Sequence, residues 1–130
     1  MAVNPPTAIR YHQKSRVLEV EFAQDVCFSM SAEYLRVYSP SAEVRGHGPG
    51  QETLQVGKEG VGIRAIEPVG NYAVKLVFDD GHDSGLYAWE ELFRLGDQQQ
   101  VLWDEYLERL AAAGHRRRPR LTVVHGPTKT

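Results

Sequence analysis

The organisation of the chain is clearest around the stretch Phe78-Asp79-Asp80-Gly81-His82-Asp83-Ser84-Gly85-Leu86-Tyr87-Ala88-Trp89. An alternating apolar and polar run, which is typical of a half-buried strand, precedes this stretch, and a run with helical spacing follows it. Between them stand three carboxylates, one histidine and two glycines. Because Asp-Gly is a frequent dipeptide of hairpin turns, we expect a turn at residues 80–81 that ordered structure holds at both ends.

Alternation of apolar and polar residues predicts several antiparallel strands. A short polar segment joins the first two of these strands, as in a hairpin. The Gly70-Asn71 turn should pair two later strands in the same way, and Pro68 is expected to end the earlier of them. The expected strands are residues 7–12, 17–22, 26–30, 61–68, 72–78 and 86–87.

Two short helices are expected between and after these strands. Ser31 is a good N-cap for a helix over residues 32–38, which Pro40 should end. A second short helix is expected over residues 89–95, where Gly96 should close it.

The last helix should be the longest. Asp97 is a good N-cap with a glutamine three residues later, as in a capping box, and Gly114 should stop the helix after residue 113. Residues 41–62, in contrast, are rich in Gly, Ser and Pro, and we expect an extended loop there. One apolar stripe should pack the last helix on the sheet, with Trp103 beside it; its members are Leu102, Tyr106, Leu107 and Leu110.

These elements predict an α+β fold: a mainly antiparallel, twisted sheet with two short helices and one longer C-terminal helix packed on it. With 130 residues, one domain can bury about two thirds of the surface that its unfolded chain exposes. We expect residues 1–6 to be a flexible leader, residues 7–114 to form the domain, and residues 115–130 to be a basic, disordered tail.

Composition and charge narrow the class of protein. The formal charge of −2 leaves no basic field for nucleic acid or an anionic membrane, so nucleic-acid binding is not favoured. No run approaches the roughly 18 apolar residues of a membrane span, and the N-terminus lacks a signal-peptide pattern. Cys27, the only cysteine, lies between Val26 and Phe28, where we expect a buried, unreactive thiol. A cytoplasmic protein fits these features.

The loop around His82 offers a metal site on its own chemistry. Imidazole and carboxylate oxygens are usual ligands of iron and zinc, so one candidate set is His82, Asp80 and Asp83 together with His47. Ligands on consecutive residues rarely converge on one ion, however. The acidic side chains can equally accept backbone N–H bonds and stabilise the turn, so both interpretations stay open.

Recognisable catalytic motifs are absent from the sequence. His82-Asp83-Ser84 lacks the His-x-Asp or His-x-Glu spacing of iron oxygenases, and no Gly-x-Ser-x-Gly elbow marks a nucleophile. The segment Gly46-His47-Gly48-Pro49-Gly50 lacks the Gly-Lys-Ser/Thr ending of a phosphate-binding loop. We therefore expect no enzyme activity.

Five separated motifs occur along residues 6–110: Leu35-Arg36, Gly46-His47-Gly48 and the stretches 66–74, 78–82 and 89–92. Together and in this order, they resemble the gamma-butyrobetaine hydroxylase-like N-terminal domain, the family also called domain of unknown function 971. In the carnitine-synthesis hydroxylases, this domain precedes a separate iron- and 2-oxoglutarate-dependent catalytic domain. That catalytic domain has no counterpart in these 130 residues.

The resemblance also implies a metal site that this chain has altered. The hydroxylase domain carries a zinc held by three clustered cysteines and a later histidine. The histidine position falls on His82, whereas the cysteine positions fall on Ser39, Ser41 and Val44. Because thiolates supply most of the affinity of a structural zinc site, we expect that the zinc function does not transfer and that His82 keeps a turn-stabilising role.

The same domain is fused to nucleotide-binding carriers that deliver iron–sulfur clusters. The resemblance therefore implies an accessory role in iron or iron–sulfur metabolism, with a partner of the iron–sulfur carrier or oxygenase type. Since one cysteine cannot hold a cluster in a monomer, we expect a non-catalytic adaptor. The alternative is an accessory protein that binds iron or zinc through His82. The expected partner surface comprises Gly46, His47, Gly48, Asp79 and His82.

Overall fold

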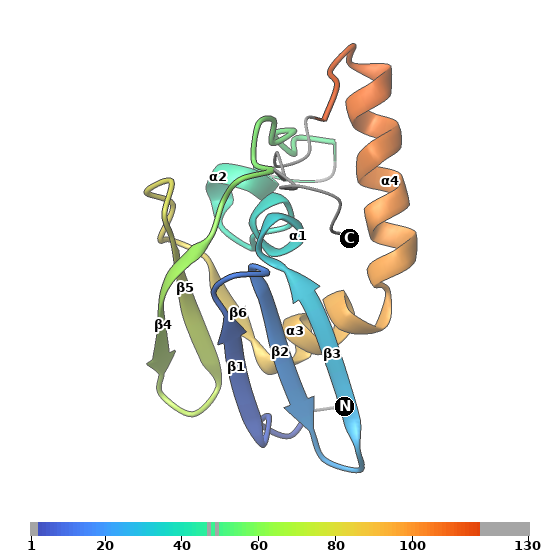
Figure 1. The fold of residues 1–130 in the computed structure, drawn as a ribbon. Coiled ribbons are helices and arrows are strands. Elements are labelled where there is room, and N and C mark those ends of the chain that lie inside the picture. Colours follow the sequence, from blue (N-terminus) through green and yellow to red (C-terminus); the bar gives the residue numbers. More distant parts are fainter. Residues whose placement is uncertain (1–2, 47, 49, 118–130) are drawn as a thin grey trace, which may run out of the picture.

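The computed structural model describes residues 3–46, 48 and 50–117, and Figure 1 shows how their strands and helices are arranged. Two three-stranded antiparallel sheets and four helices make up this part of the chain. The predicted α+β class is confirmed, although the strands form two sheets rather than one. No helix within the described ranges has both the length and the apolar character needed to cross a bilayer.

The first sheet contains β1 (Ala8–His12), β2 (Val17–Phe22) and β3 (Val26–Ser31) in that order. Every second residue of β2 is buried, as the alternation predicts, and the expected hairpin with β1 is present. The prediction of a buried Cys27 is wrong. Cys27 pairs with Glu21 on the outer face of this sheet and is exposed, because the neighbouring positions on β3 point inward.

The second sheet contains β4 (Ile63–Val69), β5 (Ala73–Phe78) and β6 (Leu86–Ala88), with β5 in the centre. The expected pairing across the Gly70-Asn71 turn is confirmed, but Pro68 does not end its strand. Pro68 pairs with Val74 inside β4. Proline is tolerated there because β4 is an edge strand, where a missing N–H need not break a ladder.

The first two helices follow the first sheet. In α1 (Ala32–Val37), the hydroxyl of Ser31 accepts the N–H of Tyr34 at 3.0 Å, which confirms the predicted N-cap. A second helix, α2 (Ala42–Arg45), lies inside the segment predicted to be an extended loop. Its N-cap is Ser41, whose hydroxyl accepts the N–H of Glu43 at 3.2 Å. The Gly-, Ser- and Pro-rich composition of the segment favours a loop, so the sequence did not predict this short helix or its N-cap.

Two helices end the described chain, α3 (Trp89–Asp97) and α4 (Gln99–Ala112). Gly96 does not end α3. A glycine is required there by packing, because a Cβ at this position would lie 2.3 Å from the ring of Phe28. The boundary falls at Gln98, so the predicted capping box at Asp97 is wrong.

The end of α4 follows the prediction more closely than its beginning. Gly114, at φ +79°, stops the helix as expected, because glycine adopts this left-handed conformation readily. Of the predicted stripe, Tyr106 and Leu110 are buried, whereas Leu107 is exposed.

One hydrophobic core joins the two sheets to α1 and α3. The largest of its fully buried side chains come from both sheets and from these helices: Leu18, Val20, Met30, Tyr34, Leu35, Leu76, Phe78, Tyr87, Leu92 and Leu95. The buried phenols are satisfied, since Tyr34 donates to the carbonyl of Leu95 at 2.6 Å and Tyr87 donates to the carbonyl of Leu35. These bonds tie α1 to α3 and to β6.

Arg117, which lies in the segment predicted to be a tail, contacts the body of the protein. Its guanidinium forms a two-pronged ion pair with the buried carboxylate of Glu33 and lies 5.3 Å from the centre of the Trp103 ring. The division into leader, domain and tail stays a prediction, and residues 118–130 lie outside the described part of the chain.

We predict that Gly96→Ala lowers the free energy of unfolding by about 1–3 kcal/mol, since its methyl group would overlap the Phe28 ring. This loss should exceed the gain of roughly 1 kcal/mol that alanine brings to a helix. Urea unfolding measures the difference. Gly60→Ala is the matched control, because the nearest atom to its new methyl group is 3.9 Å away, and it should change stability by less than about 0.5 kcal/mol. A Gly96→Ala protein as stable as the parent would contradict the packing argument.

Candidate functional site

The loop after β5 carries His82 into the interior of the protein. The chain turns at residues 79–80, and Gly81 takes the left-handed conformation at φ +93°. The N–H of Phe78 then donates to the carbonyl of His82 at 2.9 Å, which closes the turn. The imidazole is consequently only 4 % exposed.

Both ring nitrogens of His82 face polar side chains of the segment that contains α2. Its Nε2 lies 2.8 Å from the hydroxyl of Ser39, and its Nδ1 lies 3.0 Å from a carboxylate oxygen of Glu43. A neutral imidazole satisfies both contacts when Nδ1–H donates to Glu43 and Ser39 donates to Nε2. Burial and the positive charge of Arg36 lower the pKa of His82, and the carboxylate of Glu43 opposes this shift.

Hydroxyl groups extend this network. Ser84 donates to Glu43 at 3.0 Å, and its oxygen lies 2.7 Å from the hydroxyl of Ser41. The N–H of Ser41 in turn donates to the hydroxyl of Ser39 at 3.2 Å. We call the five side chains the His82 cluster; its members are Ser39, Ser41, Glu43, His82 and Ser84. Each of them has a hydrogen-bond partner inside the cluster. For the buried Ser39, Ser41 and His82, this pairing avoids a desolvation penalty, whereas Glu43 and Ser84 are exposed.

Asp80, a predicted metal ligand, is occupied by cations of the protein itself. One of its oxygens accepts from Arg36 at 3.0 Å and from Lys58 at 2.8 Å, and the other accepts the N–H of His82. Partial burial alone would raise the pKa of Asp80, but the bonds from Lys58 and His82 and the charge of Arg36 outweigh it and lower the pKa to about 2. The carboxylate is therefore ionised and internally paired.

The remaining predicted site residues are not gathered around His82. Asp83 is exposed, and Asp79 accepts the N–H of Gly62 at 3.0 Å. His47 lies outside the described residues. Within residues 3–46, 48 and 50–117, no group of three or more His, Cys, Asp or Glu side chains is arranged to hold a metal ion.

The structure does gather the positions to which the resemblance assigns the zinc ligands. Ser39 touches His82, Ser41 touches Ser39, and Val44 is buried nearby at the first turn after Ser41. Hydroxyl and methyl groups thus occupy the positions at which the hydroxylase domain has thiolates. Sequence reasoning missed Glu43, and only its place two residues after a predicted cysteine position could have pointed to it.

The order Ser39, His82, Glu43 resembles the hydroxyl–imidazole–carboxylate relay of serine hydrolases. A nucleophile must reach its substrate, however, and Ser39 is completely buried. Its hydroxyl also accepts the N–H of Ser41, so the oxygen is already engaged. The relay geometry therefore stabilises the interior and offers no reactive surface.

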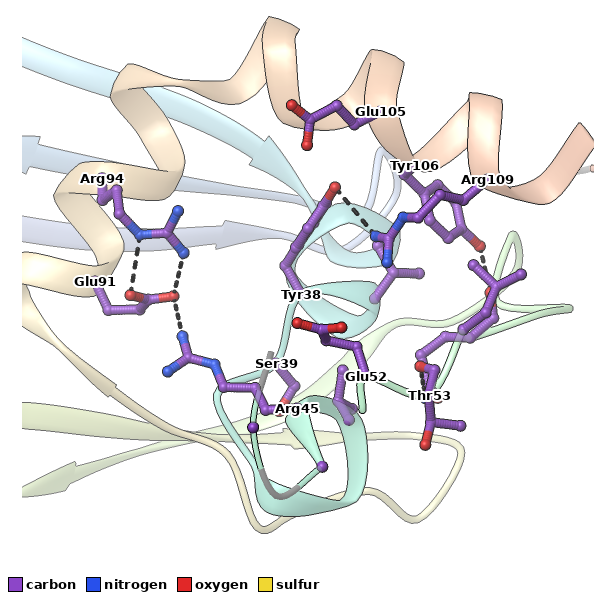
Figure 2. A pocket seen from close by; sticks show the side chains of 16 residues that line it. Tyr38, Ser39, Arg45, Glu52, Thr53, Glu91, Arg94, Glu105, Tyr106 and Arg109 are labelled. Atoms are coloured by element: carbon purple, nitrogen blue, oxygen red, sulfur yellow. Dashed lines mark hydrogen bonds and ion pairs between the residues drawn. The ribbon is translucent and has the colours of Figure 1, made fainter. Parts of the chain in front are cut away.

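A separate pocket of about 830 Å³ is lined by residues of the segment that contains α2 and by residues of α1, α3 and α4 (Figure 2). We call it the arginine pocket, because Arg45, Arg94 and Arg109 line it from α2, α3 and α4. Gly46 and Gly48, two residues of the predicted partner surface, lie on its rim. It is not part of the His82 cluster, with which it shares only Ser39.

Comparison with known proteins identifies similar sequences and structures. Residues 9–93 match the family described as gamma-butyrobetaine hydroxylase-like, N-terminal. Two proteins with NMR solution structures are 46% and 50% identical to this chain; they cover 98% and 99% of it, and it covers 100% and 95% of them, each with a TM-score of 0.78.

A third similar structure is the crystal structure of a protein of unknown function that belongs to the DUF971 family, from Acidithiobacillus ferrooxidans. It is 39% identical, over 71% of this chain and 92% of that one, with a TM-score of 0.60. No curated protein matches the chain significantly.

We predict that the parent protein loses stability as the pH falls below about 6.5 and that His82→Gln removes this loss. In the unfolded chain, a histidine keeps a pKa near 6.5, whereas burial lowers the pKa of His82 in the folded protein. Between these two values the unfolded state binds more protons, so the free energy of unfolding rises with pH in that window. Urea unfolding of both proteins from about pH 5 to 8 measures the two slopes.

Glu43→Gln provides a second variant for this experiment. Its carboxylate raises the pKa of His82, so its removal should make the loss at low pH larger than in the parent protein. Identical slopes in all three proteins would show that the imidazole is not buried as described.

Proposed function

Because the chain belongs to the gamma-butyrobetaine hydroxylase-like N-terminal family, also called domain of unknown function 971, we propose that it acts as a non-catalytic module that binds a partner protein. The observation that carries this proposal is a contrast between two polar regions. The His82 cluster buries its imidazole and the side chains of Ser39 and Ser41 and pairs its polar groups with one another, whereas most of the charged side chains that line the arginine pocket are exposed. A concave lining that combines apolar side chains with a few convergent polar groups is typical of recognition sites.

The glycine-rich rim of the pocket supports recognition of a large partner. Apart from its own chain neighbours, Gly48 has no atom within 4 Å of the position of a Cβ, so open space lies in front of its backbone. Gly46, in contrast, is pressed against the backbone of Gln51 and fixes the turn behind that space. A protein surface could therefore approach the backbone of Gly48 closely.

The family resemblance suggests what the partner is. We propose an iron–sulfur carrier or an oxygenase-type protein, with this chain in an accessory role in iron or iron–sulfur metabolism and in the cytoplasm. The chain itself offers a single thiol, which lies exposed on the outer face of the first sheet, and it belongs to no group of three or more metal-ligating side chains among the described residues. The proposed role is therefore to recognise a protein rather than to carry a cluster.

The second candidate function is metal binding through His82. The observation that favours it is the approach of an imidazole nitrogen and a carboxylate oxygen, His82 and Glu43, to 3.0 Å from each other. A metal ion there would have to displace the proton between these groups and recruit further ligands, such as Asp83 or His47. Asp80 is a weaker candidate, because Arg36 and Lys58 already bind its carboxylate.

We predict that the intact chain, used as bait in a lysate with chemical crosslinking, captures a defined protein through the surface around Gly48. Gly48→Trp should abolish the capture, because the indole would fill open space without disturbing the fold. Gly60→Trp is the matched control at an exposed glycine outside the pocket, and it should retain the capture. Mass spectrometry identifies the captured protein and the crosslinked residues.

The outcome decides the proposal directly. A protein that both the parent chain and Gly60→Trp retain, and that Gly48→Trp loses, supports the adaptor function. If the three baits retain the same proteins, or none, the proposed surface is wrong. An identified partner outside iron, iron–sulfur or oxygenase chemistry would contradict the proposed metabolic role alone.

We predict that protein purified without a chelator and without an affinity tag contains no stoichiometric iron or zinc, since the groups of the His82 cluster already satisfy one another. Elemental analysis by mass spectrometry measures the metal content. One metal ion per chain in the parent protein, absent from His82→Ala, would instead establish the second candidate function. Metal retained by His82→Ala would place the ion elsewhere, which would contradict both the predicted absence of metal and the second candidate function.

A further inference from the structure

The arginine pocket is built from segments that lie far apart in the sequence. The end of α1, the segment after α2, and helices α3 and α4 all contribute side chains to it (Figure 2). Its volume of about 830 Å³ falls within the range of ligand-binding sites. The folded protein therefore holds this arrangement of charges in place before any ligand arrives.

One wall of the pocket carries more positive than negative charge. The carboxylate of Glu91 accepts from Arg45 at 2.6 Å and from Arg94 at 2.8 Å, with a second bond from Arg94 at 3.3 Å (Figure 2). Two guanidinium groups thus share one carboxylate. Glu91 neutralises only one of the two charges, and the wall stays cationic.

Arg109 contributes a further positive charge to the lining of the pocket. Its guanidinium lies 5.7 Å from the centre of the Tyr38 ring and donates weakly to the Tyr38 hydroxyl at 3.4 Å. No carboxylate among the described residues lies within ion-pair distance of Arg109. The aromatic ring orients the guanidinium, and within the described ranges the Tyr38 hydroxyl is the one acceptor found for its N–H groups. A planar fork of this kind matches the two oxygens of a carboxylate.

Apolar groups also line the pocket. Val37, Val44 and Leu54 line the pocket, and the ring of Tyr106 closes one side. The hydroxyl of Tyr106 donates to the carbonyl of Gln55 at 2.6 Å, which fixes that side to the extended segment before β4. The pocket therefore suits a ligand that combines one anionic group with an apolar side chain.

Two further carboxylates limit how much negative charge the ligand can carry. Glu105 lies one turn before Arg109 on α4, and Glu52 accepts the N–H of Gly50 at 3.0 Å. Both are exposed, so they would repel a polyanion that covered the whole pocket. A single carboxylate directed at Arg109 avoids this repulsion.

We propose that the arginine pocket binds a short segment of the partner protein in which one glutamate or aspartate lies next to an apolar residue. The carboxylate pairs with Arg109, and the apolar side chain packs on Val44 and Leu54. This inference rests on the proposed function, because it names the chemistry by which the partner is recognised. A protein segment fits better than a free small molecule, since the walls at Arg45 and Arg109 are exposed and would leave a small ligand largely in water.

Short peptides test the proposal without knowledge of the partner. The probes are acetyl-Leu-Glu-Leu-amide and its glutamine counterpart, each titrated into the ¹⁵N-labelled full chain and followed by NMR. We expect the largest shifts at Tyr38, Val44 and Leu54. The glutamate peptide should bind at least about tenfold more tightly than the glutamine peptide, and added salt should weaken it, as for a charge-assisted contact.

Arg109→Gln should reduce the affinity for the glutamate peptide to that for the glutamine peptide. Arg10→Gln is the matched control, because Arg10 is also exposed but pairs with Glu19 and Glu21 in the first sheet, outside the pocket. This control should bind like the parent chain. Unchanged amide spectra away from the substituted side chains confirm that both variants fold.

Several outcomes would overturn the inference. These are equal affinities for the two peptides, full binding by Arg109→Gln, or shifts located away from the pocket. Tighter binding of succinate than of the glutamate peptide at the same residues would assign the pocket to a small organic acid instead. None of these results depends on a lysate, so they leave the capture experiment intact. A partner captured through Gly48 but retained by Arg109→Gln would preserve the adaptor function and reject only the acidic segment.

Discussion

The hydrogen bond between His82 and the hydroxyl of Ser39 joins two parts of the chain that lie 43 residues apart. An imidazole buried to this degree must have partners for both ring nitrogens, because an unsatisfied buried polar group costs roughly 1–3 kcal/mol. Ser39 and Glu43 supply them from one side, and the turn at residues 79–81 supplies the rigid approach from the other. This requirement fixes the segment around α2 against the second sheet.

The position of that segment determines the geometry of the arginine pocket. Arg45 ends α2, and Tyr38 immediately precedes the buried Ser39, so the same segment that satisfies His82 also presents a guanidinium and an aromatic ring to the pocket. The bond from Tyr38 to the carbonyl of Leu102, at 2.6 Å, then ties this segment to α4. A change in the His82 cluster would consequently shift the side chains that line the pocket, without any direct contact between His82 and a ligand.

Local signals in the sequence account for much of the fold. The strands that alternate, the N-cap at Ser31 and the turn at Gly70-Asn71 could be predicted because each depends on residues within a few positions of one another. The sequence alone does not reveal the role of Gly96, because a glycine near a helix end has two uses. It can end the helix, or it can leave room for a neighbour, and only the approach of Phe28 from a distant strand decides between them. The exposure of Cys27 is explained by its position in the alternating pattern of its strand and not by its apolar sequence neighbours.

The candidate sites were less predictable for the same reason. A histidine among carboxylates is visible in the sequence, so His82 could be predicted as a candidate site residue. Its actual partners, Ser39 and Glu43, come from a segment whose composition predicted only a loop. No pattern links Tyr38 to Arg109 across 71 residues. The two regions are subject to different physical constraints. Buried donors and acceptors lose their hydration and must pair with one another, whereas an exposed guanidinium stays hydrated and can remain unpaired at little cost in free energy. The exposed guanidinium of Arg109 is therefore a group with which a partner can still gain binding energy by pairing.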